Sequence, residues 1–351
     1  MTRNCIMRLG IGCVLLGIVT VARSADSSPS APPKSGVQIT RLADRLRVEI
    51  NGQLFTEYFY KDVPRPYCYP LIGPGDVAMT RNWPMKNTPG EEHDHPHHRS
   101  LWFAHGAING QDFWSEQKAF GKTVHEEFLE VTSGKKEGVI PLASPKALDL
   151  ATREVKSGKK DGVIQSRNKW VAADGTVVCT DERTLRFYNP GRANERVFDF
   201  EITLKASNGE LTFGDTKEGT MAVRLAETMR LKGKVGKGHI VNSAGVRDDQ
   251  TWGKRAEWCD YYGPVGGKTV GIAIFDHPQN PRHPTWWHVR DYGLFAANPF
   301  GQHDFENLPD KNAGNLVVPA GKSVSFRYRF YLHEGDEQQA KVAEKYRQYL
   351  K

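Results

Sequence analysis

The chain has 351 residues, and its 48 Lys and Arg against 41 Asp and Glu give a formal net charge of +7. The mean hydropathy of −0.56 excludes a protein of many membrane spans, and 8 Trp, 12 Tyr and 16 Phe are too many for a disordered chain. Residues 1–24 hold three arginines and no acid, so the remainder carries 45 basic against 41 acidic residues. This mild excess gives nucleic-acid binding little support.

The first 24 residues have the features of a secretory signal peptide. Arg3 and Arg8 precede the apolar run 11–21, and Ala22-Arg23-Ser24 supplies small residues where a signal peptidase would cleave. The run is too short for a membrane-spanning helix. We therefore expect an exported protein, periplasmic or extracellular, whose mature chain has no membrane span.

A Pro/Ser linker and one domain are expected to follow. Residues 25–36 read ADSSPSAPPKSG, a composition that does not pack. No later composition shift marks a boundary, so residues 37–351 are interpreted as a single domain. Its cysteines, Cys68, Cys179 and Cys259, are an odd set that allows at most one intramolecular disulfide, and the sequence leaves their pairing open.

The pattern beyond residue 37 is that of β-strands almost to the C-terminus. Residues 45–50 alternate, Asn51-Gly52 is a strong hairpin signal, and residues 53–60 form an aromatic-rich partner. Helical spacing is confined to the end, where a cap at Gly335-Asp336 precedes the periodic residues 340–350. The pattern predicts an all-β fold, a large antiparallel β-sandwich with a short C-terminal helix. Further strands are expected at 123–132, 163–172, 177–188, 196–205, 221–225, 269–275 and 324–333.

One segment is duplicated. Residues 130–140, EVTSGKKEGVI, return as 154–164, EVKSGKKDGVI. Two copies are too few for a solenoid. We interpret them as a local duplication that lengthened one surface hairpin.

The densest chemical feature is the segment 91–106, EEHDHPHHRSLWFAHG, which holds five of the 12 histidines. If it is extended, His93, His95 and His97 project to one face and could bind zinc or copper. Pro96 indicates a bend instead. The alternatives are a polar or acid–base site without a metal, and histidines that make structural hydrogen bonds.

The same segment supplies candidates for catalysis and binding. His97 or His98 would carry a proton, because an imidazole titrates near neutral pH. Arg99 would hold an anionic or hydroxylated ligand. Trp102 would form a stacking wall for a sugar, since the C–H face of a pyranose packs on indole.

A second cluster lies at residues 276–303. If its strand alternates, His288 lies on one face and Trp287 on the other, with Arg290 and His303 nearby and four prolines in the flanking loops. Trp287 is the second candidate for the stacking wall, and Arg290 is a second group for sugar hydroxyls or a carboxylate. His288 is a further catalytic candidate, and with His303 it completes a polar rim. The alternative is that some of these histidines only satisfy loop backbone groups. We predict that segments 93–99 and 287–303 form one concave site.

Carboxylates for acid–base work are harder to select. Glu116, Glu218, Glu227 and the pair in 257–260 are candidates, and paired carboxylates would support glycoside cleavage. Each alone is more often a solvated surface residue. We take Glu218 as the catalytic candidate.

The stretches HPHHRSLWF (95–103) and NPFG (298–301) carry a resemblance. Over about residues 37–351 the chain resembles the secreted family labelled "methane oxygenase PmoA", and its strand-rich pattern is similar to the galactose-mutarotase-like supersandwich. The resemblance implies a protein that binds or transforms carbohydrates, in which a His and a carboxylate exchange protons with a sugar, often beside an Arg.

The sequence therefore predicts an exported carbohydrate-active protein whose partner is a saccharide or glycan. Its chemistry would be acid–base catalysis in a pocket lined by His, Arg and Trp. Two alternatives stay open. One is a zinc- or copper-dependent oxidoreductase or hydrolase at His93, His95 and His97, and the other is a non-catalytic glycan-binding module.

Overall fold

The hairpin signal at Asn51-Gly52 is realised in the computed structural model. Strands β2 (Arg45–Ile50) and β3 (Gln53–Phe59) pair antiparallel around these two residues, whose φ angles are 53° and 81°. Positive φ at both turn positions matches the twist of the flanking strands and suits Asn-Gly. The apolar side of β2, with Leu46 and Val48, is buried, so alternation in the sequence becomes alternation between core and surface.

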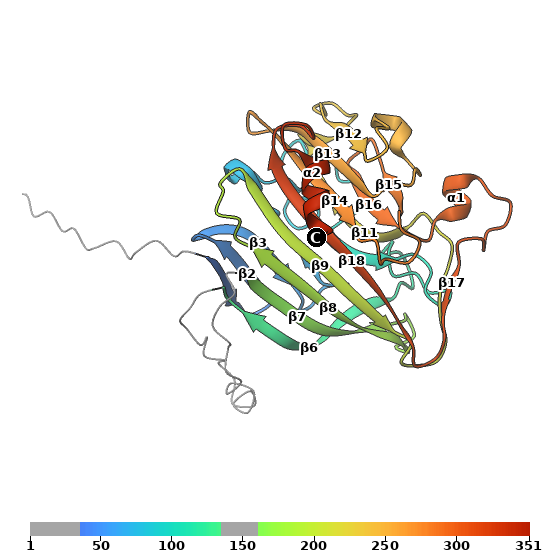
Figure 1. Ribbon diagram of the computed structural model, residues 1–351. Coiled ribbons are helices and arrows are strands. Elements are labelled where there is room, and N and C mark those ends of the chain that lie inside the picture. The colour runs from blue at the N-terminus through green and yellow to red at the C-terminus, as the bar shows by residue number, and fades with distance from the viewer. Residues whose placement is uncertain (1–35, 135–160) are drawn as a thin grey trace, which may run out of the picture. The chain divides into compact units, whose positions relative to one another are not determined.

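The structure describes residues 36–134 and 161–351 (Figure 1), which belong to the unit Lys34–Lys351. All strand pairs in these ranges are antiparallel. The first eight-stranded sheet has the order β1-β2-β3-β4-β5-β11-β16-β15. Its remaining strands are β1 (Val37–Arg41), β4 (Tyr67–Cys68), β5 (Leu101–His105), β11 (Gly219–Arg224), β15 (Trp286–Val289) and β16 (Leu294–Asn298).

The second eight-stranded sheet has the order β12-β13-β14-β18-β9-β8-β7-β6. Its long strands, β9 and β18 among them, cross the front of Figure 1. A two-stranded sheet pairs β10 (Leu211–Phe213) with β17 (Leu316–Val318). The strands of the second sheet are β6 (Lys122–Thr132), β7 (Gly162–Val171), β8 (Val177–Tyr188), β9 (Glu195–Lys205), β12 (His239–Asn242), β13 (Trp258–Val265), β14 (Lys268–Asp276) and β18 (Ser323–Glu334).

The two large sheets pack face to face. Phe103 of β5 lies against Phe200 of β9 and Phe326 of β18, with ring centroids 6.2 Å apart in both pairs, and all three rings are buried. Inward side chains of both sheets continue this core. The predicted antiparallel β-sandwich is confirmed.

The C-terminal helix is also confirmed, but it begins later than expected. Helix α2 (Val342–Tyr349) packs Tyr346 against Phe275 on the outer face of the second sheet, with ring centroids 5.5 Å apart. Asp336 does not cap it. Its carboxylate accepts the backbone N–H groups of Gln338 and Gln339 in a separate turn before the helix.

The described ranges hold four further short helices that the sequence pattern did not reveal. The helix α1 has only five residues, and it ends at Asn307, whose φ is 53°. A segment this short cannot show helical periodicity. These helices are α1 (Gln302–Glu306) and the 3₁₀ turns η1 (Pro74–Asp76), η2 (Glu227–Met229) and η3 (Asp248–Thr251).

The outer face of the first sheet has small residues at its centre. Cross-strand partners run from His288 of β15 through Ala296 and Ala222 to Trp102 of β5 and Tyr67 of β4. Two alanines between large rings leave room above the sheet. The segment 91–99, directly before β5, fills part of that room.

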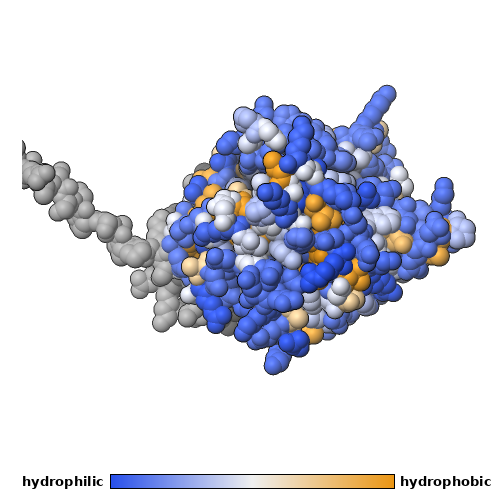
Figure 2. All heavy atoms as spheres, turned by 90° about the horizontal axis from the view of Figure 1, so that it is seen from above, coloured by the Kyte–Doolittle hydropathy of each residue, from blue (hydrophilic) through white to orange (hydrophobic). Residues whose placement is uncertain are grey.

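Three other sequence features can be located. Cys68, Cys179 and Cys259 are free thiols, all buried. Residues 135–140 and 154–160 of the duplicated segments lie outside the described residues, while β6 and β7 on either side pair with Thr132 opposite Val163. Within the described ranges, every helix is too short or too polar to cross a membrane. The face of the molecule shown in Figure 2 is mostly hydrophilic, with apolar residues in small, separate groups.

Candidate active site on the first sheet

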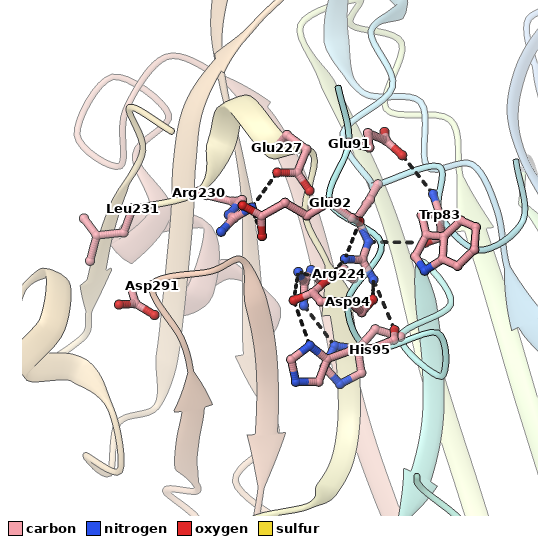
Figure 3. Close-up of polar contacts among 12 residues, drawn as sticks. Trp83, Glu91, Glu92, Asp94, His95, Arg224, Glu227, Arg230, Leu231 and Asp291 are labelled. Carbon is pink, nitrogen blue, oxygen red and sulfur yellow. Dashed lines mark hydrogen bonds and ion pairs between the residues drawn. The ribbon is translucent and has the colours of Figure 1, made fainter. Parts of the chain in front are cut away.

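The histidine-rich segment 91–99 is an irregular loop anchored by Asp94, not the extended strand on which the one-face prediction depends. The Asp94 carboxylate accepts hydrogen bonds from Arg224 Nη2 at 2.8 and 3.0 Å, from Arg81 Nη1, and from His95 Nδ1 at 2.7 Å (Figure 3). Both arginines are fully buried. Burial alone would raise the pKa of Asp94, but the hydrogen bond from His95 and the charges of Arg224 and Arg81 hold that pKa well below its usual value.

Arg81 also fixes the backbone of this loop. Its guanidinium donates to the carbonyl oxygens of Glu92, Asp94 and His95 at 2.9–3.3 Å. These bonds satisfy carbonyls that no strand pairs, and they hold His95 in a left-handed conformation with φ 41°. The loop is therefore built before any ligand binds.

Three imidazoles and one tyrosine gather on this loop. His95 stacks on His98 with centroids 4.7 Å apart and on Tyr292 at 5.1 Å, and the planes of each pair are within 11° of parallel. His97 meets the edge of His98 at 4.4 Å. Tyr292 comes from the turn between β15 and β16. The first histidine stretch thus meets the second stretch through a tyrosine that the sequence analysis did not select.

His98 lies beneath the cluster, 1% exposed. Arg224 Nη1 donates to its Nδ1 at 3.1 Å, so the neutral ring carries its proton on Nε2. Within the part of the chain that the structure describes, that Nε2 has no partner, nor have the buried Nε1 atoms of Trp102 and Trp114, whose rings pack against His98 at 5.2 and 5.9 Å. Three buried N–H donors are therefore unpaired around one ring.

The sequence prediction that His97 or His98 carries a proton near neutral pH does not fit these surroundings. Burial, together with Arg65 and His95, lowers the pKa of His97 to about 4. Burial, followed by the charges of His97 and Arg224, lowers the pKa of His98 well below its usual value. Both rings are neutral at pH 7. His95, by contrast, has a side chain that is 40% exposed.

Glu218 lies in the same environment, just before β11. Burial raises its pKa, and the positive charges of Lys217 and His95 only partly offset that effect. Burial also raises the pKa of Tyr292 to about 12, with Glu218 among the charges that contribute. Charge effects thus link Glu218 to His95 and Tyr292, and the choice of Glu218 as the catalytic carboxylate stays a prediction.

Arg99 contacts a carboxylate of the protein itself. It donates to Glu116 through Nε at 3.1 Å and Nη2 at 2.8 Å, and Arg65 pairs with the same carboxylate at 2.9 Å. Arg65 is 1% exposed and also donates to the carbonyl oxygens of His97 and Trp114. Arg99 was predicted to hold a ligand. In the structure its hydrogen bonds instead hold the Glu116 side chain beside the cluster.

Arg290 is the one predicted residue of the second stretch that reaches the cluster. Its guanidinium lies 5.6 Å from the Tyr292 ring centroid. Trp287 is fully buried between the sheets, with Nε1 donating to the carbonyl of Ala256, so it offers no exposed ring.

The two remaining histidines of the second stretch make contacts of their own. His288 is buried and accepts a hydrogen bond from Trp252 at 3.1 Å, and burial, Arg290 and Lys217 lower its pKa to about 3. His303 in α1 pairs with Asp215 at 2.9 Å. Trp102, the first candidate for the stacking wall, is 1% exposed under His98 and is likewise no open platform.

The metal set of the sequence analysis does not assemble. His93 stacks on Trp83 at 4.0 Å, whereas His95 and His97 lie 5.7 Å apart, edge to face. Across residues 36–134 and 161–351, no group of three or more His, Cys, Asp and Glu side chains is placed to hold a metal ion. The reason is the bend around His95 and Pro96, which removes the alternation on which the set depends.

Sequence reasoning missed the arginines that build the site. Arg224 ends β11, whose other residues are Gly, Thr and apolar side chains, and every residue of that strand is buried. A charged residue in such a strand signals a buried partner, here Asp94. Tyr292, Trp114 and Trp252 carried no comparable signal, because nothing in the sequence distinguishes a site aromatic from a core aromatic.

Comparison with known proteins adds a family and two distant structural neighbours. No curated protein gives a significant match. The galactosidase domain of the α-galactosidase–sucrose kinase AgaSK has a TM-score of 0.36 and 7% identity, over 86% of this chain and 41% of that chain. The galactose mutarotase related enzyme from Lactobacillus acidophilus has a TM-score of 0.25 and 8% identity, over 86% of this chain and 97% of that one.

The chain thus spans 41% of the length of the first neighbour, and at these TM-scores we take no chemistry from either. The resemblance to the family labelled PmoA stays a prediction. Residues 45–347 match the model of a family of unknown function, DUF6807. That match covers most of the sequence, and the chain belongs to this family.

Proposed function

We propose that the protein is an exported enzyme that acts on a saccharide by acid–base catalysis, with His95 and Glu218 as the proton-transferring groups. The observation that carries the proposal is the 2.7 Å hydrogen bond from His95 Nδ1 to Asp94, on a ring that is 40% exposed and lies near a carboxyl group of raised pKa. Export rests on the signal-peptide pattern of residues 1–24.

The bond to Asp94 gives His95 its chemical role. With Nδ1–H donated to Asp94, the neutral ring has a lone pair on Nε2, the atom that accepts a proton. Asp94 stays ionised, because two buried arginines stabilise its charge. It therefore orients the ring and stabilises the imidazolium once the proton has moved.

Glu218 supplies the opposite proton transfer. Burial favours its neutral form, so it keeps a proton to higher pH than an exposed glutamate does. In a turnover, His95 Nε2 takes a proton from one atom of the sugar while Glu218 gives one to another oxygen. The two groups exchange roles when the reaction runs in reverse.

The surroundings suit a sugar. Tyr292 and Arg290 are half-buried on one side of His95, and an aromatic ring with a planar cation binds the C–H face and the hydroxyl oxygens of a pyranose.

The test is turnover by the full chain. We would incubate it with glucose, galactose, their uronic acids and disaccharides of these sugars in D2O, and follow anomer exchange, deuterium incorporation, elimination and cleavage by ¹H NMR. Positioned acids and bases contribute roughly 10²–10⁴-fold. We therefore expect His95→Asn and Glu218→Gln each to slow turnover at least 100-fold, while both variants keep their thermal unfolding transition.

Two matched controls complete this test. His277→Asn and Glu210→Gln change a histidine and a glutamate in other parts of the chain, and both are expected to keep full activity. Unchanged turnover in both site variants would refute the assignment. Saccharide binding without any product would point to the glycan-binding module instead.

A further inference from the structure

Beside the cluster lies a cavity of about 220 Å³, between η3 and β15. Its lining includes the charged residues Asp248, Asp249, Arg290 and Asp291, together with the indole of Trp252. This volume is below the ~300–1,000 Å³ of pockets that take drug-sized molecules, so it suits one small unit of a larger ligand. In Figure 3 the Asp291 side chain points away from Asp94.

Arg290 is held in this cavity without a polar partner. Its guanidinium lies 5.7 Å from the Trp252 ring centroid and 5.6 Å from that of Tyr292, packed between two rings. Among the residues that the structure describes, no side chain or carbonyl accepts a hydrogen bond from it. A fixed guanidinium with free N–H groups binds oxygen acceptors.

The acidic residues define the charge of that ligand. Asp249 pairs with Lys232 at 2.7 Å, Asp291 lies 3.5 Å from the same lysine, and Asp248 accepts the backbone N–H of Ile240. Three carboxylates against Arg290 and one exposed lysine leave the lining net negative. Such a lining repels a carboxylate ligand but accepts hydroxyl protons, so the chemistry fits a neutral polyol.

Packed side chains connect this cavity to the His95 cluster. Trp252 is fixed by its hydrogen bond to His288 and by the edge of Phe305, 5.4 Å away. From Trp252 the contacts run through Arg290 to Tyr292, and Tyr292 stacks on His95 at 5.1 Å. A ligand unit seated against Arg290 is thus connected to the catalytic rings by adjacent side chains of one turn.

We infer that this cavity is a second saccharide subsite, which binds a neutral sugar unit attached to the unit at His95. The inference rests on the proposed function and narrows it, because the substrate is then a glycoside or oligosaccharide of at least two units with an uncharged unit in this subsite.

Calorimetric titration of the full chain tests the subsite. The probes are glucose and galactose, their disaccharides in α and β linkage, and the same disaccharides with a uronic acid at the non-reducing end. We expect the best neutral disaccharide to bind at least tenfold tighter than either monosaccharide. Arg290→Met, which keeps the packing between the rings, should bring the ratio of the two affinities to within about twofold of one.

Arg255→Met is the matched control. Arg255 also packs over a tryptophan, Trp286, at 4.4 Å, but it is not part of the cavity lining. It should leave the affinity ratio unchanged. The inference is overturned if disaccharides gain nothing over monosaccharides, if Arg290→Met leaves the gain intact, or if the uronic-acid disaccharides bind tighter than the neutral ones.

The two proposals fail in different ways. Monosaccharide turnover that depends on His95 and Glu218, without a gain for disaccharides, would refute the subsite and keep the proposed function. Disaccharide binding that depends on Arg290, without turnover, would keep the subsite and refute the enzyme. Absence of all saccharide binding would refute both.

Discussion

Arg224 donates one hydrogen bond to His98 Nδ1 and two to the Asp94 carboxylate, and so joins strand β11 to the histidine loop. Its guanidinium also lies 4.8 Å from the Tyr292 ring centroid. One buried side chain therefore positions a carboxylate and an imidazole of the histidine loop and a phenol from the turn between β15 and β16. The arrangement of the site depends on this residue and on the charge of Asp94 that compensates it.

Replacing Asp94 by Asn should destabilise the protein by about 3 kcal/mol. Removing one partner of a buried ion pair leaves an uncompensated charge and costs about 3–5 kcal/mol. We expect the lower end because the Asp94 side chain is 30% exposed, although Arg81 and Arg224 are not exposed at all. Urea unfolding at pH 7 measures the change. Asp310→Asn, at an exposed loop position, is the control. Equal stability of the two variants would contradict the interpretation that Asp94 compensates the charge of the buried arginines.

His98 should hold one tautomer and resist protonation. Because Nδ1 accepts from Arg224, the proton sits on Nε2, and burial keeps the pKa of the ring well below 6.5. Long-range ¹H–¹⁵N correlation spectra of ¹⁵N-histidine-labelled protein should show an unprotonated Nδ1 that does not change between pH 8 and pH 5.5. The exposed His239 is the internal reference. Titration of His98 near pH 6.5 would disprove the assignment.

Much of the fold could be predicted because alternation and turn signals are local. The strands at 45–50 and 177–188 have the expected bounds, and the hairpin at Asn51-Gly52 needed only two residues to specify it. The site was predicted only in part. Its histidines and Glu218 are visible in the sequence, but the loop at Pro96 is shaped by Arg81 and Arg224, whose contacts with residues 92–98 depend on the tertiary fold.

Environment, rather than residue type, also explains the errors in assigned roles. Arg99 and Trp102 have the chemistry of ligand-binding residues, yet the fold pairs the first with Glu116 and buries the second. Sequence spacing contains no information on burial by a distant segment such as the turn at Tyr292. The same limit applies to His97, whose pKa of about 4 results from burial and from Arg65.

Stability should fall as the pH falls below about 6.5. Mainly because they are buried, His105 has a pKa lowered to about 4 and His288 has a pKa lowered to about 3. As the pH falls, these histidines therefore take up protons in the unfolded chain before they do so in the folded protein. The stability that they contribute is fully present above pH 6.5 and is lost as the pH falls toward 3. The loss is at most about 1.4 kcal/mol for each unit by which a pKa is lowered. Urea midpoints between pH 4 and pH 8 measure this loss.

His288→Gln should flatten that dependence. Glutamine can still accept the hydrogen bond from Trp252, but it cannot take up a proton. The part of the stability loss below pH 6.5 that comes from His288 therefore disappears. The variant is expected to be less stable at pH 7 and to lose less stability on acidification than the unchanged chain. An unaltered slope would show that His288 is not the buried neutral histidine described above.

Two buried tryptophans offer a matched comparison of a paired and an unpaired indole. Trp170 Nε1 donates to Asp181 at 2.7 Å, whereas Trp102 Nε1 has no partner among the described residues, and neither ring is more than 1% exposed. Replacement by Phe removes the same volume at both positions. Only Trp170→Phe also removes a hydrogen bond to a charged acceptor, and such a bond stabilises the folded protein by about 1.5–3 kcal/mol. Trp170→Phe should therefore cost that much more free energy of unfolding than Trp102→Phe, measured in urea at pH 7. Equal costs would contradict the difference in hydrogen bonding between the two indoles.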